Sequence, residues 1–188
     1  MKIVLASSSP RRRELLTMMG LSFDVIPADV DETVDSGMPP EEVVAFLSEK
    51  KAIYVRDNID KEAIIIGADT VVAIDGLILG KPSNDAEAFE MLSRLQNRQH
   101  VVYTGVTVIS PYLKQTFIES AKVFMCKISD KEIYDYIATG EPHDKAGAYA
   151  IQDRGAVFIE RIDGDFYTVM GLPVSKLYQN FFKMTNFN

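Results

Sequence analysis

The sequence contains little cysteine and histidine. Cys126 is its one cysteine, so an intrachain disulfide is excluded, and this sparing use fits a reducing compartment. Because Cys126 lies in an apolar run, we expect a buried structural thiol rather than a nucleophile. The two histidines, His100 and His143, are far apart, so neither a His/Cys metal cluster nor a Ser/His/Asp triad can be assembled.

Long apolar runs are missing as well, and none is long enough to span a bilayer. We expect no signal peptide, because Lys2 is followed directly by a β-branched run and then by arginines. The glycines form no Walker-type or dinucleotide-binding pattern, and there is no internal repeat, linker or low-complexity segment. These absences predict a cytoplasmic protein with no membrane partner.

Positive charge is in the minority, and the formal net charge is −7. This balance argues against binding a nucleic-acid polymer, which requires a basic face, but it leaves room for a small anion in a local basic pocket. With 188 residues, of which 47% are apolar, the chain can bury a real core. We predict one domain over residues 1–188.

Hydrophobic periodicity predicts alternating strands and helices, and therefore an α/β fold. A pair of prolines followed by acids marks the start of one helix, and serine or asparagine caps mark others. The predicted helices are residues 10–19, 39–57, 85–95, 129–139 and 173–183. The predicted strands are residues 2–6, 22–28, 63–74, 77–80, 99–110 with a break at Thr104–Gly105, 115–128 and 155–162.

The first twenty residues predict a strand, a tight loop and a helix. Ser9 suits the N-cap, Pro10 the first helical position and Gly20 the position after the helix ends. Three arginines, residues 11–13, then fall in the first turn, where a helix already carries partial positive charge. Serine hydroxyls, free N–H groups and guanidinium groups are the parts of a phosphate site. The alternative is a solvated basic turn.

Asp69 is the only charged residue in the apolar run of residues 63–74. An ionised carboxylate among such neighbours is costly unless it is paired, hydrogen-bonded or bound to a metal, so Asp69 is a candidate site residue. The alternative is an aspartate at the end of the strand, with Gly67 marking a bulge. Later in the predicted helix 39–57, Lys50 and Lys51 point about 100° apart, so at most one of them can face a given site.

Short motifs occur in order along nearly the whole chain. They are SSSPRR at 7–12, GADT at 67–70, GKP at 80–82, TGV at 104–106, GEP at 140–142, DKAGAY at 144–149 and GLP at 171–173. In this set and order the chain closely resembles the Maf family of nucleoside triphosphate pyrophosphatases.

The resemblance implies a fold, a reaction and partners. The implied fold is a Maf/ITPase-like α/β fold, with an elongated mixed sheet flanked by helices and two lobes around a central cleft, often in a homodimer. The implied reaction cleaves a nucleoside triphosphate between its α- and β-phosphates, giving the monophosphate and pyrophosphate, with a divalent cation, Mg²⁺ or Mn²⁺. The resemblance also implies a house-cleaning activity against non-standard nucleotides and a link to septum formation.

The resemblance also implies roles for particular residues. The family's catalytic base falls on Asp69. Its substrate-binding positions fall on Ser7, Arg11, Arg12, Glu32, Lys51 and Lys81. Its base-discriminating positions fall on Arg11, Thr70 and Gln152.

Gln152 points to the subfamily that resembles dTTP/UTP pyrophosphatases. That subfamily carries the pattern AGAYGIQG, and this chain keeps the glutamine but has Ala150 and Asp153 in place of two glycines. An amide can donate and accept at once, which matches the adjacent carbonyl and N–H of uracil or thymine. We therefore expect dTTP and UTP to be preferred over CTP and the purine triphosphates.

The predicted chemistry also follows from the residue types. The triphosphate brings about four negative charges, and four cations, Arg11, Arg12, Lys51 and Lys81, are available to meet them. Mg²⁺ takes only one or two protein carboxylates, and Glu32 and Asp69 are the two we expect to hold it. Asp69 is expected to deprotonate a water, to bind the metal, or to do both.

Two other functions remain open at this point. One is a non-catalytic nucleotide-binding regulator of cell division that uses the same pocket and would bind dTTP without releasing pyrophosphate. The other is a nucleic-acid-binding regulator, which the net charge of −7 disfavours.

Overall fold

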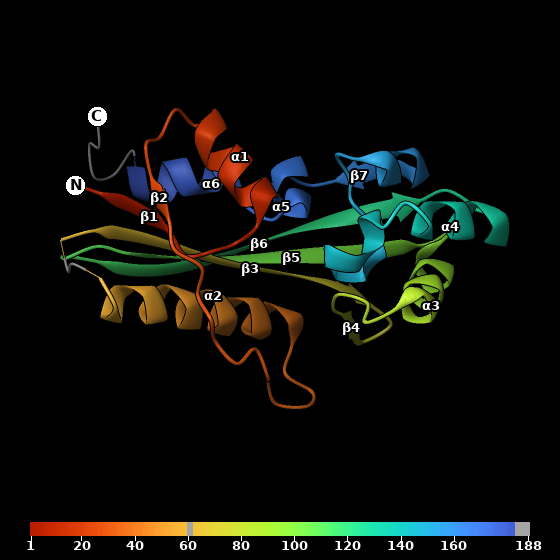
Figure 1. Cartoon of the computed structure of the whole chain (residues 1–188), viewed down its shortest axis with the longest axis horizontal. Helices are drawn as coiled ribbons and strands as arrows, with labels where there is room; N and C mark the ends of the chain where they lie inside the picture. Colours follow the sequence, from red (N-terminus) through yellow and green to blue (C-terminus); the bar gives the residue numbers. More distant parts are fainter. Residues whose placement is uncertain (60–61, 183–188) are drawn as a thin grey trace. The chain divides into compact units, whose positions relative to one another are not determined.

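The computed structural model describes residues 1–59 and 62–182, and in this part of the chain seven strands form one mixed sheet (Figure 1). β1 is parallel to both β2 and β3, whereas β4 is antiparallel to β3 and β7 to β6. The order across the sheet is β2-β1-β3-β5-β6-β7, with β4 paired to β3. The strands are β1 Ile3–Leu5, β2 Asp24–Val25, β3 Ile64–Ile74, β4 Leu77–Leu79, β5 Gln99–Ile109, β6 Lys114–Met125 and β7 Ile159–Asp163.

Helices are interspersed among these strands, which confirms the predicted α/β class. The α-helices are α1 Pro10–Met18, α2 Pro40–Asp57, α3 Asp85–Leu95, α4 Asp130–Ile137, α5 Phe166–Met170 and α6 Val174–Leu177. Short 3₁₀ helices are η1 Glu141–Asp144, η2 Ala146–Ala148 and η3 Arg154–Phe158, and η4 Tyr178–Phe182 is a π-helical turn. Among the described residues, no helix has both the length and the apolar character needed to cross a membrane.

The chain divides into two compact units. Unit 1 comprises Met1–Asp69, Thr104–Glu119 and Gly171–Asn188, and unit 2 comprises Thr70–Tyr103 and Ser120–Met170. This division agrees with the two lobes that the family resemblance implies, while the cleft stays a prediction.

α1 in unit 1 begins and ends as its sequence predicts. The Ser9 side chain accepts a hydrogen bond from the Arg12 backbone N–H, and Pro10 occupies the first turn. Beyond the last helical residues, Gly20 has a φ of 74°, the left-handed conformation that commonly ends a helix. The three arginines of residues 11–13 therefore lie in the first turn of the helix.

α2 packs closely on the sheet because two strands carry glycine beneath it. A Cβ at Gly67 in β3 would lie 2.4 Å from the Ser48 carbonyl oxygen, and one at Gly105 in β5 would lie 2.3 Å from that of Val44. Any larger residue would push the helix away from the strands. In unit 1, α2 covers one face of the sheet and α1 and α6 cover the other (Figure 1).

Unit 1 has its own apolar core around β1, β3 and α2. Its buried members are Val4, Ala6, Ala52, Val55, Ala63, Ile65 and Ile109. Lys51, on the same helix as Ala52 and Val55, is also buried, with 8% of its surface exposed. A lysine in that position needs a counter-charge.

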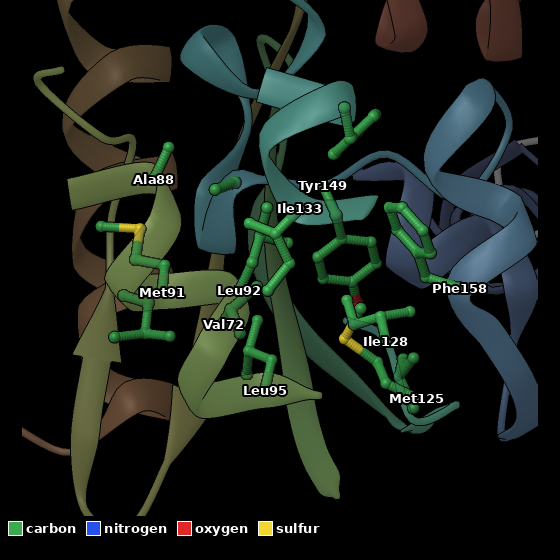
Figure 2. Close-up of a cluster of buried hydrophobic side chains, with 14 of the residues drawn as sticks. Val72, Ala88, Met91, Leu92, Leu95, Met125, Ile128, Ile133, Tyr149 and Phe158 are labelled. Carbon is green, nitrogen blue, oxygen red and sulfur yellow. The ribbon is translucent and has the colours of Figure 1, made fainter. Parts of the chain in front are cut away.

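Unit 2 is held together by a larger cluster between α3, α4 and the strands (Figure 2). Asn84 caps α3, and Ser129 with Glu132 forms a capping box at the start of α4, as the sequence predicts. The labelled members of the cluster are Val72, Ala88, Met91, Leu92, Leu95, Met125, Ile128, Ile133, Tyr149 and Phe158.

Several predicted elements are wrong in detail. β5 runs without a break through Thr104 and Gly105, because Gly105 serves the close approach of α2 rather than a turn. The strand predicted over residues 155–162 starts only at Ile159, since the preceding residues form η3. The strand predicted over residues 22–28 shortens to β2.

Two further predictions need correction. Cys126 is half-buried rather than fully buried, and its backbone N–H donates to the Phe158 carbonyl. The last helix continues from α6 as the π-helical turn η4. Lys183, the last residue predicted for it, lies outside the described residues.

Candidate active site

A buried ion pair joins β3 to α2 in unit 1. Lys51 Nζ lies 2.6 Å from Asp69 Oδ1, and Asp69 is 6% exposed. Lys51 therefore provides the counter-charge that an ionised Asp69 in an apolar strand needs. Removing one member of such a pair leaves an uncompensated buried charge, at a cost of about 3–5 kcal/mol.

A second carboxylate reaches the same ammonium from the loop before α2. Lys51 Nζ lies 2.8 Å from Glu32 Oε1, and the Glu32 side chain is largely exposed. The two acids therefore meet at one cation, with Asp69 on the buried side and Glu32 on the solvent side. Lys50 instead donates to the Asp31 carbonyl, so only Lys51 of the two lysines contacts Asp69, in keeping with the expectation that at most one can face a given site.

The pKa of Asp69 is raised above its ordinary value, chiefly by burial. The positive charges of Lys51 and Arg12 oppose that rise, and the negative charge of Glu32 adds to it. A raised pKa makes the ionised carboxylate a better proton acceptor than an ordinary aspartate. Burial together with these opposing charges is the pattern expected of a functional acid or base.

Hydrogen bonds from two of its nitrogens help to hold Arg12 in place. Its Nε donates to the Gly171 carbonyl at 2.9 Å, and its Nη1 donates to Ser7 Oγ at 3.2 Å. Burial lowers the pKa of Arg12, and the charge of Asp69 opposes this change, although an arginine keeps its proton in either case. The guanidinium is thus a fixed cation whose field reaches Asp69.

The loop between β1 and α1 surrounds this cation with further polar groups. Ser7 is buried, and its Oγ also accepts from the Ser9 backbone N–H at 3.2 Å. Arg11 is half-buried, whereas Arg13 in the same turn is exposed. A helix N-terminus, a serine hydroxyl and arginines side by side are the groups that bind phosphate.

The structure thus brings together the predicted site residues of unit 1. Lys51 contacts Asp69 and Glu32, while Arg12 contacts Ser7, and the charges of Arg11 and Glu32 act on Arg12. All of these residues belong to unit 1. Their roles in binding and catalysis stay predictions.

The other predicted site residues belong to unit 2. Thr70 is half-buried in β3, Lys81 is exposed after β4, and Gln152 is half-buried between η2 and η3. Gln152 Nε2 donates to Asp153 Oδ2 at 3.3 Å, so the aspartate that replaces a glycine of the subfamily pattern contacts the glutamine directly. Their part in the substrate site stays a prediction.

The predicted metal ligands fit a hard divalent cation. Among the described residues, no three or more His, Cys, Asp or Glu side chains gather as a metal cluster. Glu32 and Asp69 nevertheless point carboxylate oxygens at one point, the Lys51 ammonium. Mg²⁺ commonly uses one or two carboxylates, with waters and phosphate oxygens completing its shell, so this donor pair suits it.

The sequence motifs contained residues whose roles were not predicted. Gly171, in the GLP motif, orients Arg12 through its carbonyl. Glu141, in the GEP motif, accepts hydrogen bonds from the backbone on the far side of Gln152. In the sequence, only the motifs could have pointed to these two residues, because both contacts join residues more than ten positions apart.

Comparisons with known proteins show which proteins this chain is similar to. A family model described as Maf-like protein matches residues 2–184. The dTTP/UTP pyrophosphatase of Caldicellulosiruptor saccharolyticus is 49% identical over 181 residues, covering 94% of this chain and 91% of that protein. The protein of the same name from Thermoanaerobacter pseudethanolicus is 51% identical over 180 residues, covering 95% and 94%.

A third relative and one solved structure are also similar to this chain. The dTTP/UTP pyrophosphatase of Bacillus cereus is 47% identical over 176 residues, covering 94% of this chain and 92% of that protein. The Staphylococcus aureus Ham1 protein aligns with a TM-score of 0.47 at 17% identity, over 66% of this chain and 72% of that chain. A likeness of that size supports no conclusion about this chain.

Proposed function

The chain belongs to the Maf family, and from this premise we propose that it is a nucleoside triphosphate pyrophosphatase acting on dTTP and UTP. It cleaves the bond between the α- and β-phosphates and releases the monophosphate and pyrophosphate. Modified pyrimidine nucleotides fall within the same substrate class, as a house-cleaning role requires. The observation that carries the proposal is Asp69, a buried carboxylate with a raised pKa beside the fixed cations Lys51 and Arg12.

Asp69 acts as the general base. It accepts a proton from water as the water oxygen forms a bond to phosphorus, and the phosphoanhydride bond breaks so that pyrophosphate leaves with the electron pair. Lys51 holds one oxygen of the Asp69 carboxylate, and its charge opposes the rise in the Asp69 pKa that burial causes. Positioned acid–base catalysis of this kind contributes about 10²–10⁴ in rate.

The loop before α1 supplies positive charge that binds the phosphates. Arg12 is already oriented by Gly171 and Ser7, so it binds a phosphate oxygen without first having to be ordered. Arg11 and Lys81 add further positive charge, whereas the charge of Lys51 is balanced by Asp69 and Glu32. Such fixed cations stabilise the negative charge that develops in the transition state.

A divalent cation, Mg²⁺ or Mn²⁺, is the expected cofactor, and Glu32 and Asp69 are the residues that hold it. When bound, it supplies Lewis-acid stabilisation of phosphate oxygens. We place the protein in the cytoplasm, with a homodimer as its expected assembly. Light scattering of the purified protein tests the homodimer.

The test is a panel of dTTP, UTP, CTP, ATP and GTP with Mg²⁺ or Mn²⁺, in which pyrophosphate and nucleoside monophosphate are measured together. We expect equal amounts of the two products and the fastest turnover with dTTP and UTP. Release of orthophosphate in place of pyrophosphate would contradict the proposed bond cleavage. Binding of dTTP with no turnover would instead favour the non-catalytic regulator of cell division, including a role in septum formation.

A further inference from the structure

Two residues of unit 2 that had no predicted role form a bridge across the base of a short loop. Tyr136 in α4 donates its hydroxyl to Glu141 Oε1 at 2.6 Å. The same hydroxyl accepts the backbone N–H of Ala150 at 3.2 Å. We call this pair the Tyr136–Glu141 clamp.

The clamp holds the other end of the loop as well. Glu141 Oε1 accepts the backbone N–H of Gly155 and Oε2 accepts that of Arg154, each at 3.1 Å. Residues 150 and 154–155 lie on either side of Gln152 in the sequence. Both flanks of Gln152 are therefore fastened to one phenol–carboxylate pair.

The fit around the clamp is tight. A Cβ at Gly155 would lie 2.7 Å from the Tyr136 hydroxyl oxygen and 2.6 Å from the Ala150 carbonyl oxygen, so only glycine allows this approach. Tyr136 is 4% exposed, and its ring meets that of Phe158 edge to face with centroids 5.2 Å apart. Burial, with Glu141 beside it, raises the pKa of the Tyr136 hydroxyl, so the phenol stays a donor to the carboxylate.

A carboxylate that accepts three hydrogen bonds is a strong anchor, because bonds to a charged acceptor are stronger than those between neutral groups. The loop is thus fixed by side-chain contacts, whereas the Gln152 side chain itself hydrogen-bonds, among the described residues, only to its neighbour Asp153. That contact uses one amide hydrogen. The second hydrogen and the carbonyl oxygen supply one donor and one acceptor for a ligand.

We infer that the Tyr136–Glu141 clamp is the positioning device for base selection, and that it holds the Gln152 amide where it reads the paired carbonyl and N–H of uracil or thymine. The inference rests on the proposed function, because Gln152 can select a base only if the chain binds pyrimidine nucleotides. Tyr136 and Glu141 act through Gln152 and do not contact the substrate. Releasing either flank lets the amide leave its position, which weakens the contact with uracil but not the contacts with the phosphates.

The test variant is Tyr136→Phe, which removes the hydroxyl and keeps the buried ring. The readout is the ratio of kcat/KM for UTP to that for CTP. We expect this ratio to fall about three- to tenfold, the effect of one lost hydrogen bond. In a Gln152→Ala background the same substitution leaves the ratio unchanged, because the group that it positions is already gone.

Tyr134→Phe is the matched control. Tyr134 lies on the same helix, is 59% exposed, and stacks on Phe89 with ring centroids 4.6 Å apart. We expect its removal of a hydroxyl to leave the UTP/CTP ratio at the wild-type value. Glu141→Gln is the second test variant, and its amide places a donor against backbone donors, so it lowers the ratio as Tyr136→Phe does.

A purely structural role has a different signature. If Tyr136→Phe and Glu141→Gln reduce turnover of UTP and CTP by the same factor, the ratio is unchanged and the inference is overturned. A wild-type protein that treats UTP and CTP alike overturns it too. Failure of the proposed function appears separately, as no pyrophosphate from any triphosphate. In that case the ratio of Kd values for UTP and CTP, measured without divalent metal, tests the clamp by the same criterion.

Discussion

Unit 1 buries a full ion pair, Asp69 with Lys51, whereas unit 2 buries a phenol, Tyr136, whose carboxylate partner Glu141 is half-buried. In unit 1 the two opposite charges pair directly through their side chains, and the charge of Asp69 also acts on Arg12. In unit 2 the Glu141 carboxylate accepts hydrogen bonds from backbone N–H groups and thereby fixes a loop. We propose that this difference reflects two tasks: the groups of unit 1 act on any triphosphate, and the groups of unit 2 hold the residue that selects the base.

The largest expected effect comes from a substitution that removes the proposed chemistry of unit 1 and leaves unit 2 unchanged. Asp69→Asn keeps the shape of the side chain and removes the proposed base, so we expect turnover of every triphosphate to fall about 10²–10⁴-fold. Pyrophosphate release measures the loss, and circular dichroism checks that the fold is intact. Asp57→Asn, an exposed aspartate paired with Arg56, is the control and should keep full activity. Activity of Asp69→Asn within about tenfold of wild type would remove Asp69 from the role of base.

Two neighbouring arginines sharpen the comparison within a single helical turn. Arg12→Ala removes a cation fixed by Gly171 and Ser7, and we expect kcat/KM to fall about 10–100-fold, as for loss of a hydrogen bond to a charged group. Arg13→Ala removes an exposed arginine from the same turn and should change little. Steady-state kinetics on dTTP compare the two variants. Equal effects in both would mean that the loop acts only as a diffuse basic surface.

Packing offers a way to disturb unit 1 without touching a charged group. Gly67→Ala places a methyl group 2.4 Å from the Ser48 carbonyl oxygen, so α2 must shift and move Lys51 relative to Asp69. We expect a loss of about 1–3 kcal/mol in the free energy of unfolding, with reduced turnover. Denaturant unfolding measures the loss. Gly80→Ala meets no atom within 4 Å and is the control, and equal stability of both variants would disprove this account of Gly67.

The smallest expected effect is a shift in the pH dependence of kcat/KM. Burial raises the pKa of Asp69, so the acid limb of kcat/KM lies above the ordinary aspartate value of about 3.9. Lys51→Met removes the cation that opposes this rise, so the pKa rises further and activity is lost at a higher pH as the solution is acidified. Lys50→Met, whose ammonium hydrogen-bonds only to a carbonyl among the described residues, leaves the limb in place. A limb that Lys51→Met moves to lower pH would contradict the assignment.

Local sequence signals predicted the capped starts of α1 and α4 and the need of Asp69 for a partner. Ser9 and Ser129 cap their helices through contacts within three residues, so short-range rules are sufficient. The apolar run around Asp69 required a partner for its charge, and Lys51 is that partner. Even the choice between Lys50 and Lys51 had a signal, since Lys51 lies four residues from both Leu47 and Val55 on the buried face of α2.

The wrong predictions of strand limits concern residues whose conformation depends on distant contacts. Gly105 suggested a broken strand, but its role is to admit Val44 of α2, about sixty residues earlier. Gly155 suggested the start of a strand, but it is fixed against Tyr136 and Glu141. A local pattern cannot distinguish a glycine needed for a turn from one needed for close packing. The positions of Arg12 and Gln152 depend on such contacts too.

The most direct test of the central claim compares UTP with CTP in three proteins: wild type, Arg12→Ala and Gln152→Ala. We expect the wild type to prefer UTP by about 5- to 100-fold in kcat/KM, the effect of one unpaired polar group. Arg12→Ala should lower both rates and keep the ratio, while Gln152→Ala should bring the ratio close to one. Equal rates for UTP and CTP in the wild type, or a ratio that changes with Arg12 and not with Gln152, would contradict it.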